Sequence, residues 1–241
     1  MNLYIQVGSD TDIGGGRENQ DDYLVFQQND VIVLCVFDGH GREVGKIAAN
    51  AARASILAYC ESSLSELRHN PTAWLITAHE KAHLFIKESF RNELERQGFI
   101  VEEDRTGYLL KRKSIVQSQT CVHGGSSCSI IAIVGSAMYI ANVGDSAGLL
   151  CATKPIFKNA TVEHVLDSAL KPTTTLNRLK DNEEEVSTQL PEPRDNIVVT
   201  AEHSPESPYE FYRLREFRPR DGDTSQPSLL VVYDLHPSFD I

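Results

Sequence analysis

Seven apolar residues in succession, Val-Ile-Val-Leu-Cys-Val-Phe at positions 31–37, are followed at once by Asp38-Gly39-His40-Gly41. An apolar run of this length predicts a strand that is covered on both faces. Polar residues just beyond such a strand lie where a rigid scaffold meets solvent, the usual place for reactive side chains. The two glycines allow the backbone to turn sharply and to approach a ligand closely. The segment therefore predicts a carboxylate and an imidazole at one edge of a sheet.

A second acidic cluster precedes the neighbouring strand. Asp-Gly also occurs in turns without any function, so the upstream sequence decides whether Asp38-Gly39 is a plain turn or part of a functional site. Residues 23–26 predict a strand that a short turn would lay antiparallel to the apolar run, and this brings Asp21 or Asp22 near Asp38. Carboxylates gathered without a cationic partner repel each other unless a metal ion neutralises them. Hard cations such as Mg²⁺ and Mn²⁺ prefer such oxygen ligands.

A third carboxylate follows another predicted strand. Residues 126–134 and 137–144 predict a hairpin, and its second strand leads directly into Asp145. Two metal ions bridged by a carboxylate, about 3.5–4 Å apart, form the clamp that is used for phosphoryl displacement. The three strand ends therefore indicate metal-dependent chemistry on phosphate.

Five ordered blocks of sequence resemble the metal-dependent protein serine/threonine phosphatases of the PPM or type 2C family. They are Glu-Asn-Gln-Asp at 18–21, Val-Phe-Asp-Gly-His-Gly at 36–41, Gly-Gly-Ser-Ser at 124–127, Ala-Asn-Val-Gly-Asp-Ser at 141–146, and Thr-Ala-Glu-His-Ser-Pro at 200–205 with Glu210 and Arg213. The resemblance implies a hydrolase that dephosphorylates phosphoserine and phosphothreonine with a metal-activated water. It also implies an α+β fold, a four-layer α/β/β/α sandwich of two mainly antiparallel sheets with outer helices and with the metal ions between the sheets.

The resemblance implies metal ligands and a proton donor. Asp21, Asp38 and the backbone carbonyl of Gly39 would hold two Mg²⁺ or Mn²⁺ ions, and Asp145 would contribute to an additional, weaker metal site. His40 would protonate the leaving alkoxide, a role for which an imidazole is suited.

Arg17 would bind the phosphate oxygens through its forked guanidinium. The corresponding arginine of the family lies one residue further from the acidic pair when Asn-Gln-Asp at 19–21 is the anchor. Counting from Arg17 instead makes Asp22 the metal ligand, so the sequence leaves Asp21 and Asp22 as alternatives, with Asp21 preferred.

The chain departs from the family pattern at several positions. Arg42 and Ala147 stand where the family usually carries glycine and arginine, and both changes look tolerable. No strand-end Asp-Gly block and no later Asp-Asn block follows residue 213, because Asp221-Gly222 lies in a polar stretch without a preceding strand. The domain is therefore expected to be incomplete at its C-terminus, and these 241 residues alone to show little phosphatase activity. A catalytically inactive, phosphatase-like binding or regulatory module is the alternative.

Composition agrees with one domain over residues 1–241 that carries an acidic insertion at about 154–196. The formal net charge of −11 argues against a nucleic-acid partner. No apolar run approaches the roughly 20 residues that span a bilayer, and the N-terminus lacks signal-peptide features. Five cysteines without a Cys-x-x-Cys pair are typical of reduced thiols. We expect a cytoplasmic or nuclear monomer without a membrane association, whose partner is a phosphoprotein substrate.

Two helices are predicted at about 43–60 and 72–97, followed by a loop with a short strand at 98–120. The second helix contains His79-Glu80-x-x-His83, the pattern of a zinc metallopeptidase, which is a remote alternative function. The residues expected to face inward are Leu75, Ala78, Ala82, Phe85 and Ser89, which places the two histidines on the flank of the helix.

Overall fold

The computed structural model describes residues 5–15, 17–151, 196–198, 200 and 203. They fall into two compact units. One consists of the strands β10 (Leu149–Cys151) and β11 (Asn196–Val198), which pair antiparallel. The other contains β1 (Asp22–Gln28), β2 (Val31–Phe37), β3 (Gly39–His40), α1 (Gly45–His69), α2 (Pro71–Arg96), β4 (Ile100–Glu103), β5 (Leu109–Arg112), β6 (Thr120–Cys121), β7 (Gly125–Ser126), β8 (Cys128–Val134) and β9 (Ala137–Val143). The insertion expected at 154–196 lies almost entirely outside the described residues.

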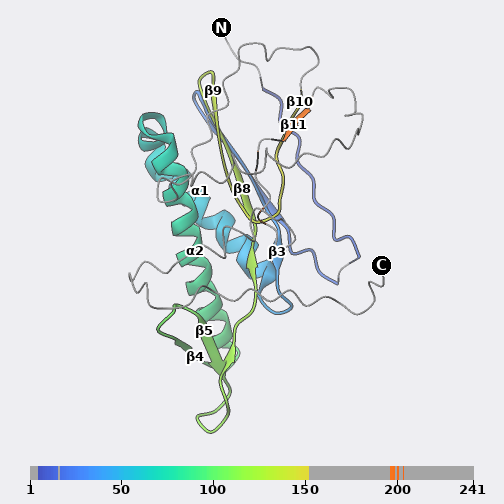
Figure 1. The fold of residues 1–241 in the computed structure, drawn as a ribbon, viewed down its shortest axis with the longest axis vertical. Coiled ribbons are helices and arrows are strands. Elements are labelled where there is room, and N and C mark those ends of the chain that lie inside the picture. Colours follow the sequence, from blue (N-terminus) through green and yellow to red (C-terminus); the bar gives the residue numbers. More distant parts are fainter. Residues whose placement is uncertain (1–4, 16, 152–195, 199, 201–202, 204–241) are drawn as a thin grey trace, which may run out of the picture. The chain divides into compact units, whose positions relative to one another are not determined.

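The main sheet has four antiparallel strands in the order β1-β2-β8-β9 (Figure 1). β1 and β2 form a hairpin whose turn holds Asn29 at a φ of 56°, a left-handed conformation that asparagine tolerates. The register pairs Gln28 with Val31 and Asp22 with Phe37. The start of β1 therefore lies beside the end of β2, and both strand hairpins predicted from the sequence are confirmed.

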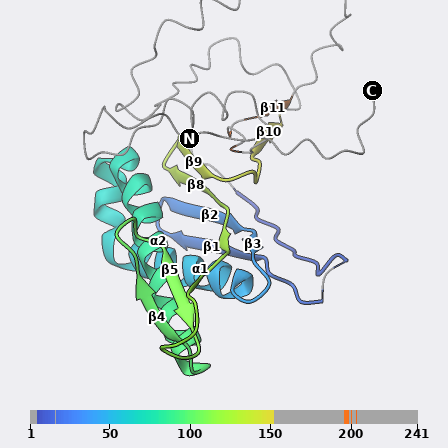
Figure 2. The same ribbon diagram turned by 60° about the horizontal axis from the view of Figure 1, so that its bottom comes forward.

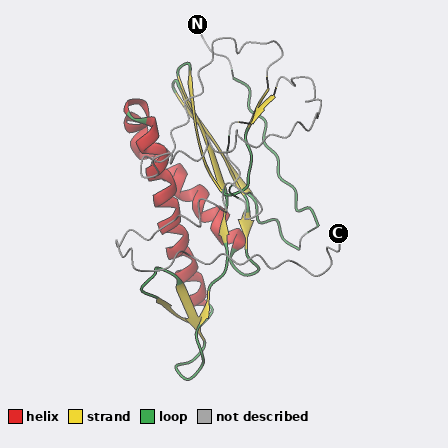
Figure 3. Cartoon of the chain, in the orientation of Figure 1, coloured by secondary structure: helices red, strands yellow, loops and turns green. Residues whose placement is uncertain are grey.

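Both long helices cover one face of this sheet (Figure 3). The core joins alternate residues of β2 and β8 with one face of each helix, and Phe37, Ile56, Trp74 and Ile130 are at most 1% exposed. Residues that alternate along a strand point to the same face, so this packing fixes the register of β2. The edge that carries Asp38 is thereby attached to a rigid scaffold.

The opposite face of the sheet is more open. Val25 and Val36 project from it and are 42% and 48% exposed. Ile32 lies on this same face of β2 and is only 7% exposed, so the expectation that β2 is covered on both faces holds for Ile32 and fails for Val36. An α+β fold with antiparallel sheets is confirmed. One helical layer on one sheet represents half of the expected four-layer sandwich.

The first helix is longer than the sequence predicted. It continues to His69 because Leu64 and Leu67 extend its buried face beyond residue 60. Ser63 interrupts the helical geometry with φ −137°, and its hydroxyl accepts a hydrogen bond of 2.7 Å from the indole N–H of Trp74. Ser63 thus marks a kink within one helix and not the end of that helix.

The segment 98–120, predicted as a loop with one short strand, contains most of a three-stranded sheet, β4-β5-β6. Figure 2 shows this sheet beside one end of α2. Phe90 and Leu94 of the helix pack against Val101 and Leu109 of the strands. The helix turns its apolar face toward this second cluster, and the prediction that Phe85 faces inward is therefore wrong, since it is 46% exposed.

The cysteine side chains within the described part of the chain are free thiols. Cys35, Cys60 and Cys128 are buried in the core, as predicted for Cys35 and Cys128. Burial raises the pKa of Cys128 to about 12, which keeps the thiol protonated and unreactive at neutral pH. Neither described helix is long and apolar enough to cross a membrane.

Candidate active site

The predicted acidic residues meet at one edge of the main sheet. Asp21 immediately precedes β1 and Asp38 immediately follows β2, and the register places these two strand ends side by side. Partial burial raises the pKa of the Asp38 carboxyl, and the negative charges of Asp21 and Asp145 raise it further. A hydrogen bond with Asp21 acts in the same direction, whereas the charge of His40 opposes it. Three side chains that the sequence singled out thus act electrostatically on the Asp38 carboxyl.

Asp21, and not Asp22, is the residue that faces Asp38. Asp22 belongs to β1, and its carboxylate accepts a hydrogen bond from the Tyr23 N–H at 2.8 Å. The same carboxylate oxygen lies 3.6 Å from Arg53 Nε of α1. Successive residues of a strand point to opposite faces, so only one of the two aspartates can turn toward Asp38. The side-chain directions favour Asp21 as the candidate ligand.

Close backbone packing holds the turn after Asp38 in place. A Cβ atom at Gly39 would lie 2.3 Å from the carbonyl oxygen of Gly45 and 2.5 Å from that of Gln20. The side-chain amide of Gln20 donates a hydrogen bond of 3.1 Å to the carbonyl oxygen of Gly41. The turn is therefore clamped between the segment before Asp21 and the start of α1. Only glycine fits at position 39.

Ser127 connects the Asp38 turn with the Asp145 turn. Its N–H donates to the Asp38 carbonyl oxygen at 2.9 Å, and its hydroxyl accepts from the Asp38 N–H at 3.3 Å. The same hydroxyl bonds the hydroxyl of Ser146, the neighbour of Asp145. Sequence reasoning gave Ser127 no role, although the Gly-Gly-Ser-Ser block that contains it was the available signal.

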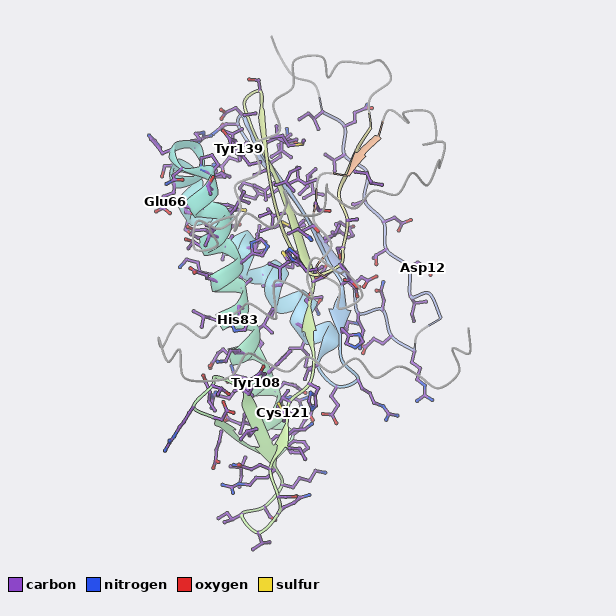
Figure 4. The ribbon with its side chains drawn as sticks, viewed as in Figure 1. Asp12, Glu66, His83, Tyr108, Cys121 and Tyr139 are labelled. Carbon is purple, nitrogen blue, oxygen red and sulfur yellow. The ribbon has the colours of Figure 1, made fainter. Side chains whose placement is uncertain are left out.

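Asp21 and Asp38 line an open cleft of about 420 Å³. The chain segment before β1, which carries Asp12 (Figure 4), forms much of its wall. The lining residues are Asp12, Ile13, Arg17, Glu18, Asn19, Gln20, Asp21, Asp38, Gly39 and Arg42. His40 and Asp145 are exposed and lie outside this lining. The cleft thus combines carboxylates with two guanidinium groups, the groups needed for binding cations and phosphate.

The donors at this edge fit a hard divalent cation. They are carboxylate and carbonyl oxygens, and the ion pairs of the described residues do not include Asp21 or Asp38. A divalent cation would balance the charge of the Asp38 carboxyl, whose pKa is raised by partial burial and further by the charges of Asp21 and Asp145. The described side chains do not form a preassembled group of three or more His, Cys, Asp or Glu ligands. Water would complete the coordination, as Mg²⁺ commonly requires.

The metallopeptidase pattern on α2 is not assembled as a metal site. The ring nitrogens of His79 lie 2.9 Å from the Leu75 carbonyl oxygen and 3.4 Å from that of Cys128. His83, labelled in Figure 4, and Glu80 are exposed to solvent. These three residues belong to the described chain, which holds no three-ligand metal cluster. The contacts of His79 therefore support a packing role between α2 and β8.

We expect His79→Ala to leave phosphopeptide hydrolysis and metal content within a few-fold of the wild type. The substitution removes the contacts of the imidazole with the backbone carbonyl oxygens of Leu75 and Cys128, neither of which lines the cleft. Hydrolysis assays and elemental analysis of the full-length natural protein check this result, with His83→Ala as the matched variant. Stoichiometric zinc that disappears in both variants would instead establish the peptidase pattern as a metal site.

Comparison with known families identifies the class of protein. The sequence matches the protein phosphatase 2C family over residues 16–170, which is more than half of the chain. The chain therefore belongs to the protein phosphatase 2C family. No curated protein matches the chain significantly.

Proposed function

We propose that this protein is a metal-dependent protein serine/threonine phosphatase whose centre lies at the edge of the sheet formed by β1 and β2. Membership of the family supports protein phosphatase activity in general. The observation that carries the proposal is the interaction of Asp21 with Asp38 in a cleft that also contains Arg17. Two acidic strand ends beside an arginine provide sites for divalent cations and for the phosphate that they activate.

Asp21, Asp38 and the backbone carbonyl of Gly39 are the proposed ligands of Mg²⁺ or Mn²⁺, and Asp145 is proposed for an additional ion. When bound, these ions supply a water of lowered pKa and balance the charge of the phosphoryl oxygens. The clamped Gly39 turn and the Ser127 bonds support the proposal because they fix the backbone of Asp38. Positioned ligands lose little freedom when the site is filled.

Arg17 and His40 are proposed to act on the substrate. The Arg17 guanidinium presents paired N–H donors that match two phosphate oxygens. When the bond between phosphorus and the seryl or threonyl oxygen breaks, a ring N–H of protonated His40 delivers its proton to that oxygen. His40 suits this role because it is exposed directly after the Asp38-Gly39 turn.

A binding module without catalysis is the second candidate. One observation favours it: the described residues contain no preassembled group of three metal-binding side chains. Such a protein would still recognise phosphate through Arg17, but it would hold metal ions too weakly for hydrolysis.

The assay that separates the two candidates measures phosphate release from phosphoserine and phosphothreonine peptides by the full-length natural protein. The enzyme proposal predicts release when Mn²⁺ or Mg²⁺ is added and none in excess chelator. Phosphopeptide binding without release would support the binding module. Undiminished release in chelator would contradict the metal-dependent mechanism.

A further inference from the structure

Arg42 is a second guanidinium at the candidate active site that the proposed chemistry does not use. It lies in the turn between β3 and α1 and lines the same cleft as Arg17 and Asp38. The carbonyl oxygen of the preceding Gly41 accepts hydrogen bonds from the Gln20 amide and from the Gly45 N–H. The backbone that carries Arg42 is therefore anchored, while its side chain is exposed.

The charge of Arg42 is available to a ligand. Among the described residues Arg42 forms no ion pair, whereas the adjacent Glu43 pairs with Lys111. Glu18, which lines the same cleft, pairs with Lys46 at 3.2 Å. These two carboxylates thus pair with lysines and leave the guanidinium of Arg42 open. An anionic group entering the cleft would meet a guanidinium that forms no ion pair with the described residues.

The cleft can receive more than a single phosphorylated side chain. The cleft is open to solvent, and its volume of about 420 Å³ leaves room beside a bound phosphate group. Arg17 is the proposed partner of the phosphoryl group, so Arg42 remains for another anion of the same substrate. An extended peptide advances only about 3.3 Å per residue. That second anion therefore belongs to a residue close in sequence to the phosphorylated one.

We propose that Arg42 determines substrate specificity by binding a second acidic group, a carboxylate or another phosphate, one or two residues from the phosphoserine or phosphothreonine. This inference rests on the proposed phosphatase function of the same cleft. Arg42 contacts a residue beside the phosphorylated one and not the reacting phosphorus. It therefore changes the relative affinities for different phosphopeptides.

The charge of the rest of the protein opposes this preference. The chain carries a formal net charge of −11, and Asp12 and Glu18 also line the cleft. Long-range repulsion of an acidic peptide is screened beyond about 8 Å at physiological salt, whereas direct contact with a guanidinium is not. If the acidic lining dominated, the protein would prefer basic flanking residues. The direction of the preference therefore tests whether Arg42 makes the contact.

The test measures binding of fluorescein-labelled peptides to the full-length natural protein with Mn²⁺ present. The peptides share one sequence with a non-hydrolysable phosphonate in place of phosphoserine, and they carry Glu, Ala or Lys on either side of it. Fluorescence anisotropy reports affinity independently of turnover. We expect the Glu peptide to bind about two- to five-fold more tightly than the Ala peptide, the size of a solvent-exposed ion pair.

Variants of Arg42 give the decisive comparison. Arg42→Ala should bring the ratio of the Glu and Ala affinities close to one, and Arg42→Glu should invert it. Arg105→Ala is the matched control, because Arg105 is an exposed arginine outside the cleft lining, and it should keep the wild-type ratio. The inference would be overturned, and the proposed function left standing, by any of three results. These are equal affinities of the wild type for the Glu and Ala peptides, tighter binding of the Lys peptide, or an unchanged affinity ratio in Arg42→Ala. Failure of all the peptides to bind would overturn both the inference and the proposed function.

Discussion

Asp38→Asn is expected to lower kcat/KM for phosphopeptide hydrolysis by about 100-fold or more. Loss of a group that only supports a metal ligand typically costs 10–100-fold, so loss of the ligand's own charge should cost at least as much. Asparagine keeps the shape of the side chain, and the hydrogen bonds of the Asp38 backbone to Ser127 remain. The activity should therefore fall without a loss of the fold.

The control for this variant is thermal unfolding of the metal-free protein. Partial burial raises the pKa of the Asp38 carboxyl, and repulsion by the charges of Asp21 and Asp145 raises it further. Neutralising Asp38 removes this repulsion, so the Tm should stay the same or rise. Near-wild-type activity in Asp38→Asn would exclude Asp38 as an essential ligand. A large fall in Tm would show that its role is structural.

Gly39→Ala is expected to destabilise the protein by about 3 kcal/mol, the upper part of the usual range for overpacking, and to abolish its activity. The new Cβ would lie 2.3 Å from the Gly45 carbonyl oxygen and 2.5 Å from that of Gln20. Both obstacles are backbone atoms, so a side-chain rotation cannot relieve the contact. The segment before Asp21 and the start of α1 would have to move apart, which displaces two of the proposed metal ligands, Asp21 and Asp38.

Chemical unfolding of Gly39→Ala beside Gly125→Ala measures this effect. Gly125 pairs with His40 across β3 and β7, and a Cβ at this position meets nothing within 4 Å. Gly125→Ala should therefore remain within about 1 kcal/mol of the wild type. Equal stability of the two variants would show that the turn is looser than its packing indicates.

The sequence predicted the elements that have strong local signals. The apolar run at 31–37 and the paired runs around it predicted the hairpins, because apolar patterning and turn residues are local properties. Strand ends then predicted that carboxylates would gather at one edge. The choice between Asp21 and Asp22 required the directions of the side chains. The sequence alone allowed two alignments with the family, one anchored on Asn-Gln-Asp at 19–21 and one anchored on Arg17.

Other features depend on contacts between distant segments, which local patterns do not contain. The bonds of Ser127 join the turns after β2 and β9. The strands between 100 and 121 form because Val101 and Leu109 pack on Phe90 and Leu94 of α2, and not because of a clear alternation of polar and apolar residues. Glu210, Arg213 and Asp221, which the sequence comparison raised, lie outside the described residues.

The most direct test of the central claim is Mn²⁺-dependent phosphate release by Asp21→Asn and Asp22→Asn variants of the full-length natural protein. Asp21 interacts with Asp38 and lines the cleft. The Asp22 carboxylate lies 3.6 Å from Arg53 Nε, and Asp22 does not line the cleft. We predict that Asp21→Asn lowers kcat/KM by about 100-fold or more and weakens Mn²⁺ binding in calorimetry, while Asp22→Asn changes both by only a few-fold. Equal losses in the two variants, or full activity of Asp21→Asn, would contradict the assignment of the metal centre to this edge of the sheet.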